Sequence, residues 1–247
     1  MDTVLREYFS NESEEFNNYT AKSHSLSRET SNWEHLYTDI LDKEVKRILN
    51  VGCGPGTEAI LLAKMGYEVT ALDFSPQMIE YTKENAKLHN VSIKTVIGDA
   101  EDLPFEGDCF DAIVSNYAMW AIPNPQKAME EWHRVLRPGG EVAYIDVGHS
   151  ENKGLRKTWA RLAMKLRKKD NNDHSRELSD EETSHLSNLW STRMTRPGED
   201  LKLMKDAGFY KVECIDKVDR RIFSGMRYVE YGYHKIHFMI RGWKPSE

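Results

Sequence analysis

Residues 48–60 read ILNVGCGPGTEAI, an apolar run that leads into a glycine-rich turn and then into a helical segment. Gly52, Gly54 and Gly56 allow the backbone to turn sharply and to approach a ligand closely. Their spacing is G-x-G-x-G, which differs from the G-x-G-x-x-G of dinucleotide-binding proteins. Pro55 removes one N–H group from the loop, which disfavours a phosphate-binding nest. We therefore expect a ligand-binding turn that does not hold a pyrophosphate.

Strand and helix signals alternate around this turn. Strands are expected at 45–51, 67–73, 91–99, 109–116, 141–147, 210–216 and 228–243, and helices at 57–66, 76–89, 125–136 and 199–207. Ser75-Pro76 and Asn124-Pro125 are typical helix starts. This alternation predicts an α/β fold: a Rossmann-like, seven-stranded, mostly parallel sheet with helices on both faces.

The flanking segments do not follow this pattern. Residues 1–44 are polar with scattered aromatic residues, and we interpret them as an N-terminal helical cap on the domain formed by residues 45–247. Residues 148–200 read as a helical insertion that forms a lid. It includes a basic helix at 153–169 and a short helix that begins at Ser179 with a capping box.

Composition limits the function. The chain has 247 residues and a net charge of −6, which disfavours bulk nucleic-acid binding through phosphate charge. It has no long apolar run for a membrane span and no signal-peptide pattern at its start. Three scattered cysteines do not form a disulfide framework. These features predict a cytoplasmic protein. We expect no metal site, and either a monomer or a homodimer is compatible with the sequence.

Two acidic residues follow predicted strands. Asp73 ends the second strand, 21 residues after Gly52, where a carboxylate can accept hydrogen bonds from ribose hydroxyls. The alternative role, a helix N-cap, is already taken by Ser75. Asp99 ends the third strand, where a carboxylate can accept from an exocyclic amine, although a simple turn acid would look the same. Ligands bind at this edge of open α/β sheets.

Four motifs in order resemble a known family. They are ILNVGCGPGTEAI at 48–60, VTALDFSPQM at 69–78, GDAEDLPFEGDCFDAIVSN at 98–116 and EWHRVLRPGGEV at 131–142. Together they are similar to the class I S-adenosylmethionine-dependent methyltransferases, and most similar to the type 11, ubiquinone/menaquinone-type small-molecule group. The resemblance covers residues 45–147.

The resemblance implies a cofactor, S-adenosyl-L-methionine, with S-adenosyl-L-homocysteine as the product. The implied cofactor-binding residues are Gly52, Cys53, Gly54, Gly56, Asp73, Phe74, Met78, Asp99, Ala100, Glu101 and Asn116. Among them, Asp73 would hold the ribose, Phe74 and Met78 would pack on the adenine, and Asn116 would lie beside the methionine part. Nearby carboxylates and aromatic faces suit a cationic sulfonium.

The acceptor half matches no substrate signature. His149 and Tyr117 are the candidate catalytic residues: His149 follows the fifth strand and could act as a base, and Tyr117 follows the fourth. The candidate substrate residues are Tyr19, His24, Trp33 and Trp120. Ordinary packing remains the alternative role for each of the aromatic residues.

The leading hypothesis is transfer of a methyl group to a small-molecule acceptor by in-line displacement. One alternative is methylation of a macromolecule, tRNA or protein, docked on the basic helix. Another is a non-catalytic S-adenosylmethionine-binding protein, which the intact glycine turn and Asp73 disfavour. The sequence Asn116-Tyr117-Ala118-Met119 lacks the Pro-Pro of enzymes that methylate DNA amino groups, so we expect no DNA partner.

Overall fold

The structure is a computed structural model that describes three long ranges and a few residues before them. The long ranges are 27–148, 179–223 and 236–246, preceded by residues 4, 7–9, 13, 14 and 17. The predicted basic helix at 153–169 and the first half of the predicted strand at 228–243 lie outside these ranges. The proposed lid at 148–200 and the boundary at residue 45 therefore remain predictions.

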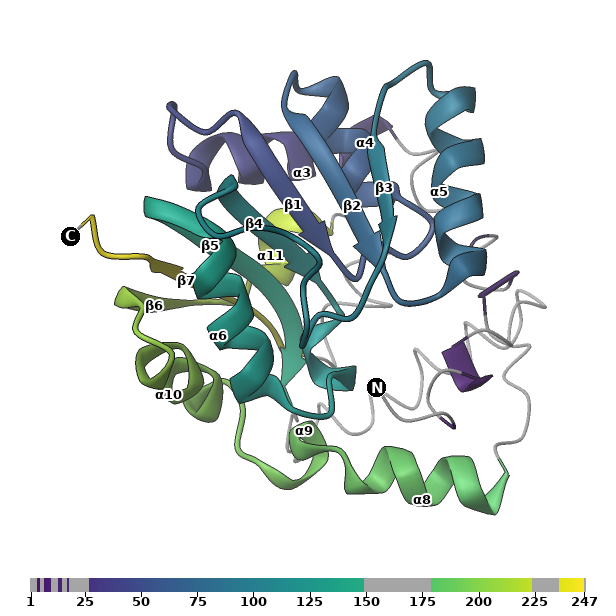
Figure 1. Cartoon of the computed structure of the whole chain (residues 1–247), viewed down its shortest axis with the longest axis vertical. Coiled ribbons are helices and arrows are strands. Elements are labelled where there is room, and N and C mark those ends of the chain that lie inside the picture. The colour runs from purple at the N-terminus through teal and green to yellow at the C-terminus, as the bar shows by residue number, and fades with distance from the viewer. Residues whose placement is uncertain are drawn as a thin grey trace.

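Seven strands form one mixed sheet, as the sequence predicts (Figure 1). The strands are β1 (Arg47–Val51), β2 (Glu68–Asp73), β3 (Lys94–Ile97), β4 (Phe110–Asn116), β5 (Leu136–Gly148), β6 (Tyr210–Asp216) and β7 (Ile236–Trp243). Their order is β3-β2-β1-β4-β5-β7-β6. The first five strands in this order pair in parallel, whereas β7 is antiparallel to both β5 and β6.

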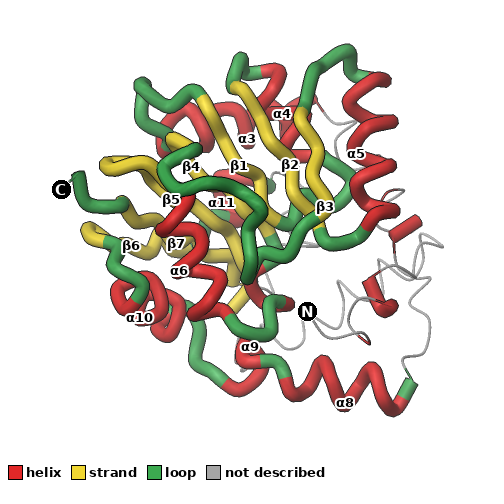
Figure 2. The backbone as a smooth tube through the Cα atoms, viewed as in Figure 1, coloured by secondary structure: helices red, strands yellow, loops and turns green. Residues whose placement is uncertain are grey.

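Helices cover both faces of the sheet (Figure 2). The helices are α3 (Ser27–Ile40), α4 (Thr57–Lys64), α5 (Pro76–Leu88), the 3-10 turn η1 (Met119–Ala121), α6 (Pro125–Val135), α8 (Asp180–Asn188), α9 (Trp190–Arg193), α10 (Gly198–Asp206) and α11 (Asp219–Ile222). The predicted starts at Ser75, Asn124 and Ser179 are confirmed, because each side chain accepts a backbone N–H of its helix. None of the helices in the described ranges has both the length and the hydrophobicity that a membrane crossing needs.

The core has two halves, one on each side of the sheet. Along β1, Ile48 packs with α3, α4 and α11, whereas Leu49 and Val51 pack with α6 and α10. This alternation follows from the period of two in a strand, and burial on both faces explains the nearly continuous apolar runs. The predicted apolar stripe of α6 is buried, and Trp132 at its centre is completely enclosed.

Some boundaries differ from the sequence prediction. The strand predicted at 141–147 begins at Leu136, because the chain pairs with Phe110 immediately after α6 and the register then shifts. Gly139, with φ of 74°, therefore lies inside the strand and not in a loop. β3 is shorter than the predicted 91–99, and η1 and α11, each three or four residues long, were not predicted.

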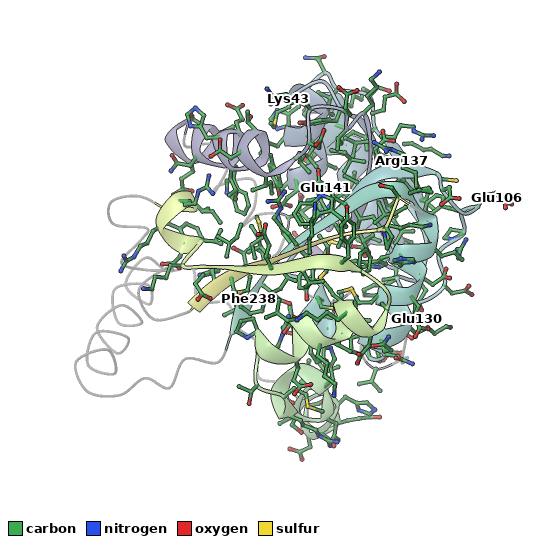
Figure 3. All side chains as sticks on the ribbon, turned by 90° about the vertical axis from the view of Figure 1, so that its left-hand side faces the viewer. Lys43, Glu106, Glu130, Arg137, Glu141 and Phe238 are labelled. Carbon is green, nitrogen blue, oxygen red and sulfur yellow. The ribbon has the colours of Figure 1, made fainter. Side chains whose placement is uncertain are left out.

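Side-chain placement follows the layers. Figure 3 shows Glu141 of β5 inside the molecule, whereas Glu106 and Glu130 reach its surface. Glu141 is 2% exposed, and its carboxylate accepts a hydrogen bond from the Asp42 backbone nitrogen at 2.7 Å and pairs with Arg241 at 3.2 Å. The fold thus tolerates a buried acid at this position by giving it a cation and an N–H donor.

Candidate functional site

The predicted site residues come together where the parallel strands end. The glycine turn follows β1, Asp73 is the last residue of β2 and Asn116 is the last residue of β4. The arrowheads of β1, β2 and β3 in Figure 1 point to this edge. Because β1 lies between β2 and β4, the glycine turn lies between the two flanking side chains.

The glycine turn adopts a conformation that its sequence requires. Gly52, Gly54 and Gly56 have φ values of 67°, 53° and 89°, in the left-handed region. A Cβ on Gly52 would lie 2.4 Å from the Ala118 Cβ, and one on Gly56 would lie 2.8 Å from the Thr82 side chain. A Cβ on Gly54 would meet no described atom within 4 Å, so this part of the loop has open space beside it.

Asp73 links this loop to the start of α5. One carboxylate oxygen accepts a hydrogen bond from the Gly54 nitrogen at 2.9 Å and the other accepts from the Ser75 nitrogen at 2.9 Å. Burial raises the pKa of Asp73, and the hydrogen bonds from Ser75 and Gly54 oppose that rise. Each oxygen has a second lone pair, so the carboxylate retains the capacity to accept from a ligand hydroxyl.

Cys53 takes part through its backbone and its packing. Its nitrogen donates to the Leu72 carbonyl at 3.0 Å, which fixes the turn to β2. Its side chain is 3% exposed and lies 3.6 Å from the Thr82 hydroxyl. Burial raises the pKa of the Cys53 thiol well above its usual value, so the sulfur stays protonated. We conclude that Cys53 supports the loop and is no nucleophile.

The residues expected around the adenine lie on the β2–β3 side. Met78 is buried and Phe74 is half-buried. Asp99 accepts a hydrogen bond from the Glu101 nitrogen at 3.0 Å, which makes it at least a turn acid, the alternative that the sequence left open. Glu101 in turn accepts from the Asn124 nitrogen at 2.9 Å, and Ala100 packs against the core. Asp99 and Glu101 therefore shape this loop.

Asn116 lies on the opposite, β4 side, with partners that the sequence analysis missed. Its Nδ2 donates to the Tyr37 hydroxyl at 2.6 Å, and Tyr37 is 1% exposed. Trp33, a predicted substrate residue, is 6% exposed and stacks on Tyr37 with ring centroids 5.9 Å apart. Trp33 thus supports Tyr37 from within the core. The aromatic spacing of α3 was the signal for this, although no pattern indicated which ring would reach the site.

The segment after β4 forms the neighbouring wall. Tyr117 has a φ of 56°, and its ring meets His237 edge-on at 5.8 Å. Trp120 donates its indole N–H to the Tyr117 carbonyl at 2.8 Å and its backbone N–H to Asp146 at 2.8 Å. The Trp120 carbonyl accepts from Ser191 at 2.6 Å. These bonds fix Trp120 in one orientation.

A buried ionic cluster stands behind this wall. Arg196 pairs with Asp146 at 2.9 Å and with Asp200 at 2.6 Å, and all three side chains are at most 1% exposed. Tyr144 donates to Asp200 at 2.9 Å, and the Arg196 guanidinium lies 4.7 Å from the centre of the Trp190 ring. Burial raises the pKa of Asp146, and the positive charge of Arg196 opposes that rise. The sequence analysis missed this cluster, although the four-residue spacing of Arg196 and Asp200 is typical of an ion pair on a helix.

An N-terminal aromatic residue reaches the same place. The Phe9 ring lies 5.8 Å from Phe74 and 5.9 Å from Trp120, edge-on to both. It therefore touches one residue expected on the cofactor side and one expected on the acceptor side. Phe9 was not among the predicted site residues. Three that were, Tyr19, His24 and His149, lie outside the described residues.

Residues 49–144 match a protein-family model described as a methyltransferase domain. A demethylmenaquinone methyltransferase from Staphylococcus haemolyticus is 38% identical over 116 residues, which cover 46% of this chain and 48% of the relative. A malonyl-[acyl-carrier protein] O-methyltransferase from Salmonella typhimurium is 30% identical over 156 residues, which cover 63% of this chain and 58% of the relative. The chain thus spans about half the length of the curated relatives it matches.

Solved structures share the fold over more of the chain. The [4+2]-cyclase SpnF superimposes with a TM-score of 0.59 at 20% identity, covering 87% of this chain and 80% of SpnF. A methyltransferase candidate from Bacillus halodurans gives a TM-score of 0.57 at 20% identity, covering 87% of this chain and 99% of that protein. Together with the four ordered motifs, the family match shows a methyltransferase domain at residues 49–144, and the solved structures show that the fold continues beyond it.

Proposed function

We propose that this chain binds S-adenosylmethionine across the glycine turn and transfers its methyl group to a small-molecule acceptor. The open space beside Gly54, with the desolvated Asp73 carboxylate next to it, is the observation that carries the proposal. A turn of this kind lets the ligand approach the backbone closely, and the second lone pairs of Asp73 suit the two ribose hydroxyls.

When bound, the cofactor supplies a methyl group on a positively charged sulfur; the acceptor atom bonds to the methyl carbon as the carbon–sulfur bond breaks, and the electron pair stays on sulfur. The protein then has to hold the two reactants in line and exclude water. Trp120, fixed through its backbone N–H, carbonyl and indole N–H, would provide a rigid wall for the acceptor. Tyr117 and His149 remain our candidates for contact with the acceptor.

Support for a small-molecule acceptor comes from the relatives. The names of the two relatives above specify methylation of demethylmenaquinone and of a malonyl group on a carrier protein. The fold alone does not establish transfer, since SpnF shares it and is a cyclase. The assignment therefore has to be tested at the level of the donor first.

Calorimetric titration of the full chain tests the donor. We expect S-adenosylmethionine and S-adenosylhomocysteine to bind in the micromolar range and NAD to give no binding heat. Asp73→Asn keeps one oxygen that can accept a hydrogen bond from the loop, but it removes the negative charge. We expect this variant to bind S-adenosylmethionine and S-adenosylhomocysteine at least tenfold more weakly. The control is Asp111→Asn, which should bind normally; Asp111 is a buried acid that accepts hydrogen bonds from the Lys46 and Arg47 nitrogens at the start of β1. Absence of binding to the wild-type chain would reject the proposed function.

Release of S-adenosylhomocysteine tests the acceptor. Two probes follow from the relatives: a 1,4-naphthohydroquinone that lacks the ring methyl group, and a malonyl thioester. Product with either probe would support a small-molecule acceptor. Product only with tRNA or protein fractions would instead support the macromolecular alternative.

A further inference from the structure

Glu58 lies within the first motif, but it is not among the cofactor-binding residues that the resemblance implies. It lies in the first turn of α4, two residues after Gly56, and it is half-buried. The N-terminal end of a helix favours a negative charge, which gives one ordinary reason for an acid at this position. Its surroundings, however, resemble those of a buried charge and not of a solvated helix end.

Glu58 shares its environment with Tyr37 and Asn116. Burial raises the pKa of Glu58, and hydrogen bonding by Asn116 opposes that rise. Burial also raises the pKa of Tyr37, and the negative charge of Glu58 raises it further. Since Asn116 donates to Tyr37 at 2.6 Å, the three side chains form one polar group on the β4 side of the glycine turn. The helices that carry Tyr37 and Glu58, α3 and α4, cover the same face of the sheet (Figure 1).

Three other desolvated acids of this fold have a cationic partner, whereas Asp73 accepts hydrogen bonds from backbone nitrogens. Asp111 pairs with Arg137 at 2.8 Å, Glu141 with Arg241 at 3.2 Å and Asp146 with Arg196 at 2.9 Å. Within residues 27–148, 179–223 and 236–246, no lysine, arginine or histidine forms an ion pair with Glu58. Removing a charge from water is costly unless an opposite charge compensates it. A cation supplied by a ligand would complete the pattern.

The sheet order indicates which part of a ligand meets Glu58. Asp73 ends β2 on one side of the turn, whereas Asn116 ends β4 on the other side. If the ribose lies at Asp73, a ligand that crosses the turn presents its opposite end to Asn116, Tyr37 and Glu58. For S-adenosylmethionine that end is an amino acid, which carries an α-ammonium group.

We infer that Glu58 binds the α-ammonium group of the cofactor, and that Asn116, which also bonds Tyr37, holds the Glu58 side chain in place. This inference rests on the proposed function. It makes Glu58 a cofactor-binding residue and distinguishes it from an acid that only stabilises the start of α4.

Two ligands that differ at one end test this assignment. S-adenosylhomocysteine carries the amino acid, whereas 5′-methylthioadenosine has the same adenosine and thioether without it. We expect Glu58→Gln to weaken S-adenosylhomocysteine about tenfold or more and 5′-methylthioadenosine less than twofold in calorimetric titration of the full chain. Glu58→Asp, which keeps the charge on a shorter side chain, should recover part of the lost affinity. By contrast, Asp73→Asn should weaken both ligands.

Glu199→Gln is the matched control. Glu199 is also half-buried and also the second residue of its helix, α10, on the opposite face of the sheet. The variant removes the same negative charge from the same position near a helix N-terminus. It should leave the affinities for S-adenosylhomocysteine and 5′-methylthioadenosine unchanged. A third ligand is decarboxylated S-adenosylhomocysteine, which keeps the amine but lacks the carboxylate. Glu58→Gln should bind it more weakly than the wild-type chain does, as with S-adenosylhomocysteine.

Two results would overturn the inference while leaving the proposed function intact. One is equal weakening of both ligands by Glu58→Gln, which would indicate a structural role. The other is unchanged or tighter binding of S-adenosylhomocysteine, which would indicate that Glu58 does not meet a cation. Failure of the wild-type chain to bind either ligand would instead reject the proposed function, and the inference with it.

Discussion

The backbone nitrogen of Trp120 donates a hydrogen bond to Asp146, which joins the turn after β4 to the end of β5 at a distance of 2.8 Å. The same Asp146 oxygen pairs with Arg196 at 2.9 Å. Arg196 belongs to the segment between α9 and α10, about 75 residues further along the chain than Trp120. The orientation of Trp120 therefore depends on a buried ion pair formed by a distant segment.

Asp146→Asn should loosen Trp120 without changing the cofactor side. The variant leaves the Arg196 charge only partly compensated, and breaking a buried pair of this kind costs about 3 kcal/mol. We expect that loss in urea unfolding. In the ¹⁹F spectrum of protein labelled with 5-fluorotryptophan, the Trp120 resonance, assigned with Trp120→Phe, should broaden or split. The control, Asp111→Asn, should destabilise the fold but leave that resonance unchanged. A Trp120 resonance that Asp146→Asn does not affect would show that the Asp146–Arg196 pair does not orient Trp120.

Gly52→Ala and Gly54→Ala should lower the free energy of unfolding by different amounts, although both glycines have a positive φ. The left-handed conformation costs about 1–2 kcal/mol for alanine at either position. Only at Gly52 does the new Cβ also collide, 2.4 Å from the Ala118 Cβ. Overpacking adds about 1–3 kcal/mol, so we expect Gly52→Ala to be the more destabilising in urea unfolding. The double variant Gly52→Ala/Ala118→Gly should recover the steric part; no recovery would show that the cost has another origin.

The stabilising effect of Asp111 should disappear in acid. Burial alone would raise the pKa of Asp111, but hydrogen bonds from Arg47, Arg137 and the Lys46 nitrogen outweigh it and lower the pKa. A carboxyl whose pKa is lowered by folding stabilises the protein above its unfolded pKa of about 3.9, and this contribution is lost as pH falls through the folded pKa. Because both arginines are partly exposed, we expect Asp111→Asn to cost about 1.5 kcal/mol at pH 7. The difference from wild type should shrink below pH 4; a constant difference from pH 7 to pH 3 would contradict the assignment.

Phe9→Ala should expose Trp120 to solvent. The Phe9 ring lies edge-on to the rings of Trp120 and Phe74, with centroid distances of 5.9 and 5.8 Å. Removing it opens space on the acceptor side, so acrylamide should quench the Trp120 fluorescence more strongly, measured as the difference from Trp120→Phe. Leu88→Ala, at a side chain that is 76% exposed on α5, should leave quenching unchanged. Equal quenching in Phe9→Ala and wild type would rule out a covering role for Phe9.

Local patterns in the sequence account for the sheet and its two covered faces, and they predict the residues on the cofactor side of the site. The period of two at Ile48 and Leu49 and the cap at Ser75 act over a few residues, so the sequence carries them directly. Asp73 was predicted as a ligand-binding acid, and that role remains a prediction. Its hydrogen bond to the Gly54 nitrogen was not foreseen, because it depends on how closely β1 and β2 approach each other.

The sequence by itself determined the order of the main strands and helices along the chain, the glycine turn and the edge of the sheet where we predict that a ligand binds. Only the tertiary structure brought Tyr37 to Asn116, Phe9 to Trp120 and Arg196 to Asp146. Each of these pairs joins segments that are far apart along the chain, and packing decides which of many aromatic or charged residues meet. Spacing in one sequence contains no record of such contacts, which is why the residues around the acceptor side were the hardest to predict.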